Sequence, residues 1–180
     1  MPIIAEIAVT GATSIASAVN DLSVTTGATS ISVRLAAGAS QTLTQTEFDS
    51  VKSQLGNIKP AVGASLAVTV TGVAASNVSI ILGASLPTGV SIQAITVSDS
   101  ASNIGTALND LHSNLSKISS ITLTDSAPAP LITVAAADYS NDADVLAKIS
   151  RYTLKITDAT SITSASNLLA ADAKITRIDL

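Results

Sequence analysis

The residue types that most often carry catalysis are nearly missing from this 180-residue chain. Cysteine and tryptophan do not occur, and the only histidine is His112, next to Leu111 and close to Asp110. Without cysteine the chain cannot form disulfides, zinc-thiolate sites or iron-sulfur clusters, and it has no thiol nucleophile. A single histidine on an amphipathic segment is most often a surface or boundary residue, and it does not establish a Ser-His-Asp triad. We therefore expect no catalytic residues and no enzymatic activity.

One acidic run, from Asp138 to Asp144, places side-chain oxygens at alternate positions, as a calcium-binding loop does. It departs from the EF-hand pattern, because Ala143 stands where the turn needs glycine and Ile149 where a bidentate glutamate closes the site. The alternative is that these carboxylates favour the N-terminal end of a helix dipole. The calcium candidates are Asp138, Asp142 and Asp144. We expect no cofactor and no other metal.

Hydroxyl side chains recur at alternate positions of several apolar segments. They are Thr69, Thr71, Thr96, Ser98, Thr122 and Thr124. If these segments are neighbouring strands in register, the hydroxyls form rows on one face that could order water or contact a sugar. Lys155, Arg177 and Arg34 interrupt the array, aromatic rings for a glycan platform are lacking, and threonine is also simply a good strand former. A binding module for glycans or ice is therefore the alternative function.

The segments that carry these hydroxyls alternate apolar and polar residues with period two, as strands with one buried face do. We predict strands at 4–10, 31–36, 66–71, 94–99, 120–125, 152–158 and 175–180. Successive strands start roughly 23 to 35 residues apart, within the range of solenoid repeats. The chain is therefore expected to consist of repeating units.

Between the strands the apolar period changes to that of a helix. Ile104, Leu108, Leu111 and Leu115 predict a helix over 102–115. Shorter helical patterns lie at 15–22, 78–82 and 162–169, and others follow the extra apolar segment 131–134 and the capping-box pair formed by Thr44 and Glu47. Each strand is thus followed by a helical segment.

A strand, a helix and a further strand at this spacing imply a crossover, so the strands should be parallel. Polar residues at alternate strand positions argue against a doubly wound sheet that is buried on both faces. We therefore predict an α/β open solenoid of repeating strand-helix units, with a parallel sheet on one face and helices on the other. It forms a single domain over 1–180, with approximate units 1–30, 31–65, 66–93, 94–119, 120–151 and 152–180.

The composition narrows the class of protein further. A hydrophobic content of 47% and a mean hydropathy of +0.50 argue against disorder. No stretch approaches the ~18 apolar residues of a membrane span. A net charge of −4 and few aromatic residues argue against nucleic-acid binding. No N-terminal Sec signal is visible, because a basic region and a long apolar region are lacking.

Two stretches carry a resemblance to a known family. Residues 95–104 read ITVSDSASNI, and residues 119–126 read SSITLTDS. They resemble the Ala/Thr-rich repeats of very large bacterial secreted and surface proteins, which type I systems often export and which include adhesins and surface-layer proteins. The likeness is strongest over about 95–158, while Gly11 and Gly72 stand where the repeat has aspartate. The resemblance implies an extracellular or cell-surface location and a structural or adhesive role.

Solenoids normally need polar caps at both ends, because their terminal coils otherwise expose apolar surface and unpaired strands. The first predicted strand starts close to Met1 and the last finishes at Leu180, with no cap visible. We therefore expect head-to-tail self-association into a filament or surface layer. The residues expected to carry it are Ile3, Ile4, Ile7, Ile175, Ile178 and Leu180. The alternatives are a boundary within a longer solenoid, or fraying ends on a stable monomer.

The expected function is thus that of a non-enzymatic extracellular structural protein. Its main partner is a second copy of the same chain, and cell-surface glycans are the partner of the alternative binding function.

Overall fold

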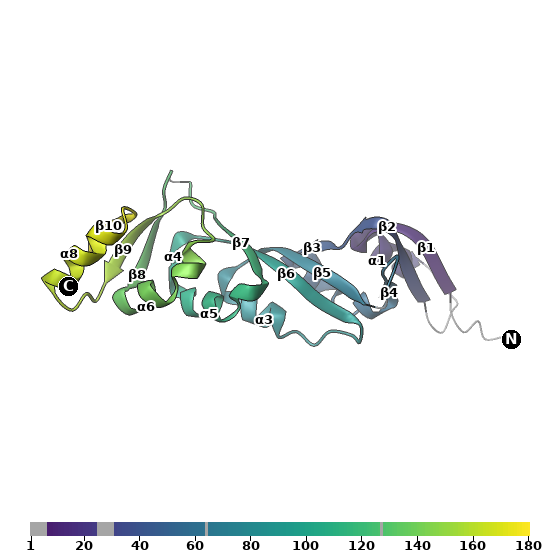
Figure 1. Ribbon diagram of the computed structural model, residues 1–180. Helices are drawn as coiled ribbons and strands as arrows, with labels where there is room; N and C mark the ends of the chain where they lie inside the picture. Colours follow the sequence, from purple (N-terminus) through teal and green to yellow (C-terminus); the bar gives the residue numbers. More distant parts are fainter. Residues whose placement is uncertain (1–6, 25–30, 64, 127) are drawn as a thin grey trace. The chain divides into compact units, whose positions relative to one another are not determined.

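The computed structural model describes residues 7–24, 31–63, 65–126 and 128–180 (Figure 1). The strands are β1 (Ile7–Ser14), β2 (Ile31–Ser40), β3 (Thr42–Thr44), β4 (Ile58–Lys59), β5 (Leu66–Val73), β6 (Val90–Asp99), β7 (Ile118–Leu123), β8 (Leu131–Ala135), β9 (Thr153–Thr157) and β10 (Ile175–Ile178). The helices are α1 (Ile15–Val24), α2 (Gln45–Val51), α3 (Val78–Leu82), α4 (Ala101–Thr106), α5 (Leu108–Ser113), α6 (Ala136–Asn141), α7 (Ala143–Leu146) and α8 (Ile162–Ala171). Short 3-10 turns, η1 (Leu55–Asn57), η2 (Ala75–Asn77) and η3 (Leu115–Lys117), complete the series.

The strands form three separate sheets, with the orders β1-β2-β4, β3-β5-β6-β7 and β8-β9-β10. Every strand pair whose register is described is parallel. The predicted mixed α/β class with parallel strands and crossover helices is therefore confirmed. The sheets are small and separate, where a single continuous sheet was expected.

Strands β7 and β8 lie in different sheets. Pro128 and Pro130 precede β8, and proline lacks the N–H that a strand ladder needs. Beyond β7 the pairing is reduced to one isolated parallel bridge between Ile121 and Ile149. The chain therefore starts a new sheet at β8.

The chain divides into two compact units, which are described one at a time. The first comprises Met1–Thr71 with Gly83–Ala94, and the second comprises Gly72–Leu82 with Ile95–Leu180. Strands β5 and β6 contribute residues to both units.

In the first unit, α1 follows β1 directly and buries Ile15 and Ala18, as its helical pattern predicts. The predicted capping box is confirmed at α2: Thr44 Oγ1 accepts a hydrogen bond from the Glu47 N–H, and Glu47 Oε2 accepts one from the Thr44 N–H at 2.7 Å. This cap fixes the helix start so that the single phenylalanine of the chain, Phe48, is fully buried.

In the second unit, the predicted helix over 102–115 is divided into α4 and α5. The two helices are separated at Ala107, whose N–H donates a hydrogen bond to both the Asn103 and the Ile104 carbonyls. Gly105 lies where α4 meets β8, and a Cβ at this position would lie 2.6 Å from the Thr133 carbonyl oxygen. Gly105 and Thr106 are poor helix formers, so the sequence favours a break just after this close contact. The apolar residues of the pattern, Ile104, Leu108 and Leu111, are buried as expected.

Helix α8 exists where the pattern at 162–169 predicts it, but it differs from the other helices in its burial. Ser161 caps it by accepting a hydrogen bond from the Ser164 N–H at 3.1 Å. None of its residues is buried, and Ile162 is 74% exposed. The helix therefore has an apolar side that the described chain does not cover.

Candidate functional sites

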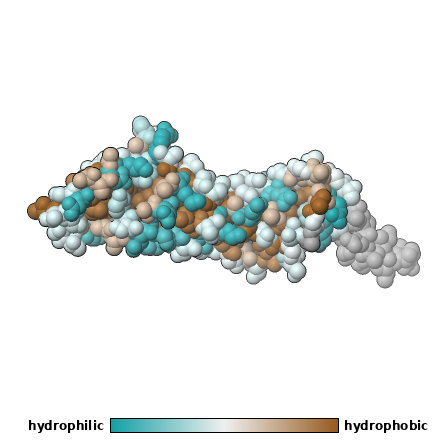
Figure 2. All heavy atoms as spheres, viewed as in Figure 1, coloured by the Kyte–Doolittle hydropathy of each residue, from teal (hydrophilic) through white to brown (hydrophobic). Residues whose placement is uncertain are grey.

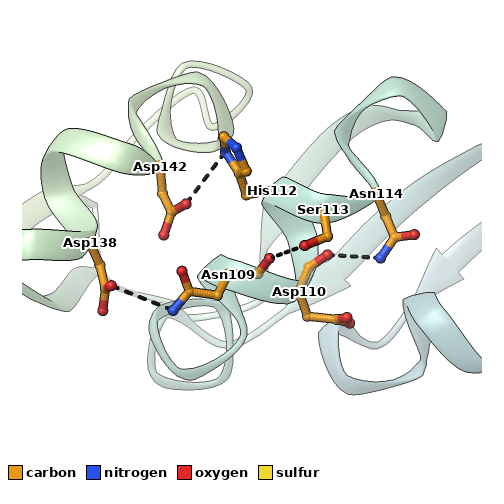
Figure 3. Close-up of polar contacts among 7 residues, drawn as sticks. All are labelled: Asn109, Asp110, His112, Ser113, Asn114, Asp138 and Asp142. Carbon is orange, nitrogen blue, oxygen red and sulfur yellow. Dashed lines mark hydrogen bonds and ion pairs between the residues drawn. The ribbon is translucent and has the colours of Figure 1, made fainter.

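The most unusual polar group of the second unit is the carboxylate of Asp142, at the junction of α6 and α7. Its side chain is 1% exposed, and neither carboxylate oxygen has a hydrogen-bond partner among the described residues. His112 on α5 points toward it, with Nδ1 3.4 Å from Asp142 Oδ1, while about half of the imidazole is exposed (Figure 3). The two side chains thus form an ion pair when the imidazole is protonated and the carboxylate is ionised.

Neighbouring polar contacts attach α5 to the helices on either side, and Figure 3 shows the contact with α6. Asn109 donates to Asp138 on α6, with Nδ2 and Oδ1 3.5 Å apart. Asn114, which follows α5, donates to the Ser79 hydroxyl on α3 at 3.0 Å, and that hydroxyl donates to Asp110. Polar pairs therefore join three successive helical segments.

The electrostatics of Asp142 reflect these surroundings. Burial, the largest cause, raises the pKa of Asp142 above its ordinary value, and the nearby charge of Asp138 raises it further. The charge of His112 opposes both effects by lowering the pKa. Protonation of Asp142 is therefore easier than that of an ordinary aspartate.

The three carboxylates predicted as calcium candidates do not converge on one point. In the ranges that the structure describes, no group of three or more His, Asp or Glu side chains is placed to hold a metal ion. Asp138 is engaged by Asn109, Asp142 is packed inside the unit, and Asp144 is exposed in the first turn of α7. The three carboxylates therefore have different surroundings, and calcium binding at these residues stays a prediction.

The predicted hydroxyl rows fall in register in each unit. In the first unit, Thr42 and Thr44 of β3 pair with Thr69 and Thr71 of β5. In the second, Thr96 pairs with Ser120, and Ser98 with Thr122. The sequence analysis missed the partners Thr42, Thr44 and Ser120. The alternation Thr42-Leu43-Thr44 was the available signal for the first two, but three residues are too few to predict a strand.

Two of these hydroxyls form hydrogen bonds with backbone groups of a neighbouring strand. Thr71 Oγ1 donates to the Leu43 carbonyl at 3.3 Å, and Thr96 Oγ1 accepts from the Gly72 N–H at 3.2 Å. Thr124 follows the end of β7, so it is outside the strand rows, although its side chain is exposed. Thr122 is also exposed, and the remaining members of the predicted set are half-buried.

Two aspartates at strand ends connect one strand-helix unit to the one before it. Asp99 Oδ2 accepts from the Ala75 N–H at 2.9 Å, and Asp125 Oδ2 accepts from the Ala101 N–H at 2.7 Å, each across 24 residues. Both donor N–H groups lie at the N-terminal end of a helical segment, where backbone N–H groups lack partners. The repeated Asp was visible in the sequence, but its reach into the preceding unit was not.

The residues predicted to carry self-association differ in how far their side chains are exposed. Ile3 and Ile4 lie outside the described residues, and Ile7 begins β1. Ile175 is only 5% exposed, so it packs inside its own unit, whereas Leu180 is 71% exposed. Ile178 is half-buried on β10.

Ile162 and Leu169 are exposed apolar residues that were not among the predicted self-association residues. Their helical spacing alone predicts burial in the chain's own core. They are 74% and 48% exposed on α8. Figure 2 shows apolar surface, in brown, over the part of the second unit that holds α8 and β10.

Comparisons with known proteins give no family for this chain: no family model matches it, and no significantly similar curated protein or solved structure was found. Among the helices that the structure describes, none combines the length and the apolar character needed to cross a membrane.

Proposed function

We propose that this chain is a non-enzymatic structural protein that associates with further copies of itself, and that α8 with β10 forms one of the contact surfaces. The observation that carries the proposal is the exposure of α8, none of whose residues is buried. Ile162 and Leu169 are exposed on this helix, and Leu180 is exposed after β10. Strand β10 lies at the edge of its sheet and pairs only with β9 among the described strands.

The equivalent apolar pattern inside the second unit supports this reading. Ile104 and Leu111 have the same seven-residue separation as Ile162 and Leu169, and both are fully buried where neighbouring helical segments cover them. A second copy packed on α8 would remove Ile162 and Leu169 from water in the same way. Burial of an aliphatic side chain of this size contributes roughly 2 kcal/mol.

We extend the proposal to the arrangement of the copies. The sequential order of strands within each parallel sheet favours an open solenoid of strand-helix units, with the edge of β10 facing the edge strand β1 of the next copy. Such a contact joins two different surfaces and does not close, so it generates a filament or layer. The likeness to repeats of bacterial surface proteins supports an extracellular or cell-surface location.

The test is the mass of the purified chain as a function of concentration, followed by light scattering and by negative-stain microscopy. We expect the mass to increase with concentration and elongated particles to form. The substitution Leu169→Glu should weaken association at least about tenfold, because it costs about 1.4 kcal/mol or more to place a charge in an apolar contact.

The matched control is Asn167→Glu, which adds the same charge at an exposed position of the same helix. Its association should follow that of the unmodified chain. A chain that stays monomeric at high concentration, or equal association of the two variants, would contradict the proposal.

A second candidate function is a binding module on the hydroxyl face, favoured by the registered pairs Thr96–Ser120 and Ser98–Thr122. Its ligands would be glycans or ice. Glycan-array binding or thermal hysteresis that is lost in Thr122→Val supports this function. If the unmodified chain shows no glycan binding and no thermal hysteresis, this second function is excluded.

A further inference from the structure

We propose that His112 and Asp142 form a proton-dependent latch that fastens α5 to the junction of α6 and α7. This inference concerns the second unit alone and does not depend on the self-association described above.

The main chain holds Asp142 firmly in place at this junction. Its N–H donates to the Asp138 carbonyl at 2.8 Å, and its own carbonyl accepts from the N–H groups of Val145 and Leu146 at 3.0 and 3.1 Å. These backbone hydrogen bonds therefore hold the carboxylate in its buried position. It has no freedom to reach water unless α6 or α7 moves.

A buried carboxylate without hydrogen-bond donors is costly unless a positive charge accompanies it. His112 supplies that charge when it is protonated, because Nδ1 lies 3.4 Å from Oδ1. Neither oxygen of Asp142 has a hydrogen-bond partner among the described residues, so the buried charge is compensated through the ion pair. The buried carboxylate is therefore stabilised when the imidazole carries a proton, and its charge is uncompensated when the imidazole is neutral.

The other charged groups near the junction do not replace His112. Asp138 on α6 and Asp110 on α5 are acidic and are engaged by Asn109 and Ser79. Helix α3 and strand β8 contain no titratable residue.

The remaining charged groups of these elements are directed elsewhere. Asp144 on α7 is acidic and exposed. The Lys148 ammonium, after α7, donates to the Ile118 carbonyl at 2.6 Å. Tyr139 on α6 donates to Asp172, and Lys155 on β9 pairs with Asp179.

The direction of the pH effect follows from these facts. Burial raises the pKa of Asp142 above its ordinary value of 3.8, so the folded chain retains a proton that the unfolded chain releases. A raised pKa contributes stability that is complete below the ordinary value and is lost as the pH rises through the folded value. The latch therefore loosens from acid toward neutral pH.

Thermal unfolding of the full chain from about pH 4, near the ordinary aspartate pKa of 3.8, up to neutral pH tests the latch. In Asp142→Asn the buried charge is absent, so the unfolding midpoint should exceed that of the unmodified chain by about 4 °C at the upper pH and converge with it at the lower one. Asp144→Asn removes an exposed carboxylate two residues away and should follow the unmodified chain. Parallel profiles for Asp142→Asn and the unmodified chain would overturn the proposal.

A second measurement starts from the unmodified chain and needs no variant for its first result. The carboxyl ¹³C resonance of Asp142 should titrate above the ordinary aspartate range in the unmodified chain. In His112→Gln it should titrate at still higher pH, because the charge that lowers its pKa is gone. An ordinary titration of Asp142, or one that His112→Gln leaves in place, contradicts the latch.

Discussion

At the scale of single residues, the aspartates at strand ends explain how adjacent strand-helix units hold together. Asp99 and Asp125 each accept a hydrogen bond from a backbone N–H 24 residues earlier, so one carboxylate completes the helix start of the preceding unit. Asp99 also accepts from Asn103 Nδ2 at 2.7 Å. The sequence analysis identified the recurring Asp, but a contact between units depends on register, which the sequence pattern does not define.

Asp125→Ala should destabilise the second unit, because it leaves the Ala101 N–H without its acceptor. A charged acceptor at such a position contributes about 1–2 kcal/mol. Urea unfolding should therefore show a lower midpoint with an unchanged slope. Asp144→Ala, at an exposed position of α7, is the control and should change the midpoint little. Equal midpoints for the two variants would contradict the role of Asp125.

Asp99 also predicts a loss of stability in acid. Burial opposes ionisation, but hydrogen bonds from Asn103, Ala75 and Ser100 prevail and hold the pKa of Asp99 below its ordinary value of 3.8. Its contribution is present above the ordinary value and is lost as the pH falls through the folded one. Asp99→Asn should therefore lose less stability than the unmodified chain when the pH is lowered through this range, as measured by chemical unfolding. An identical acid dependence in both chains would refute this.

At the scale of elements, strand and helix identities were largely predictable, whereas their limits and contacts were not. The helical spacing correctly predicted α1, α3 and α8, and the capping box correctly predicted the start of α2. Strands β3 and β4 were missed, because three and two residues carry too little periodicity to be distinguished from loops. The exposure of α8 was unpredictable from its own pattern, since burial depends on which neighbours cover it.

At the break between α4 and α5, we predict that a glycine-to-alanine substitution lowers stability, although helix propensity alone predicts that it raises stability. Alanine normally stabilises a helix by about 1 kcal/mol relative to glycine. At Gly105, however, an added Cβ would lie 2.6 Å from the Thr133 carbonyl oxygen of β8. Gly105→Ala should therefore destabilise the second unit by about 1–3 kcal/mol, as measured by urea unfolding.

The control is Thr106→Ala, next to Gly105 and exposed on the same helix. It should be neutral or slightly stabilising, because alanine is the better helix former. A stabilised Gly105→Ala would show that α4 and β8 are not in close contact.

At the scale of the whole molecule, the parallel α/β character could be deduced from the alternation of strand and helix periods. The division into three small sheets could not, because it depends on where irregular segments such as the one containing Pro128 and Pro130 interrupt the ladder. The proposed structural role rests on the exposed apolar side of α8 and the edge position of β10.

The most direct test of that role is amide hydrogen exchange of the full chain at low and at high protein concentration. Association through α8 and β10 predicts that protection in these two elements increases with concentration, while α5, which is already covered, keeps its protection. Unchanged exchange in α8 and β10 at high concentration would contradict the account, even if the chain aggregated by another route.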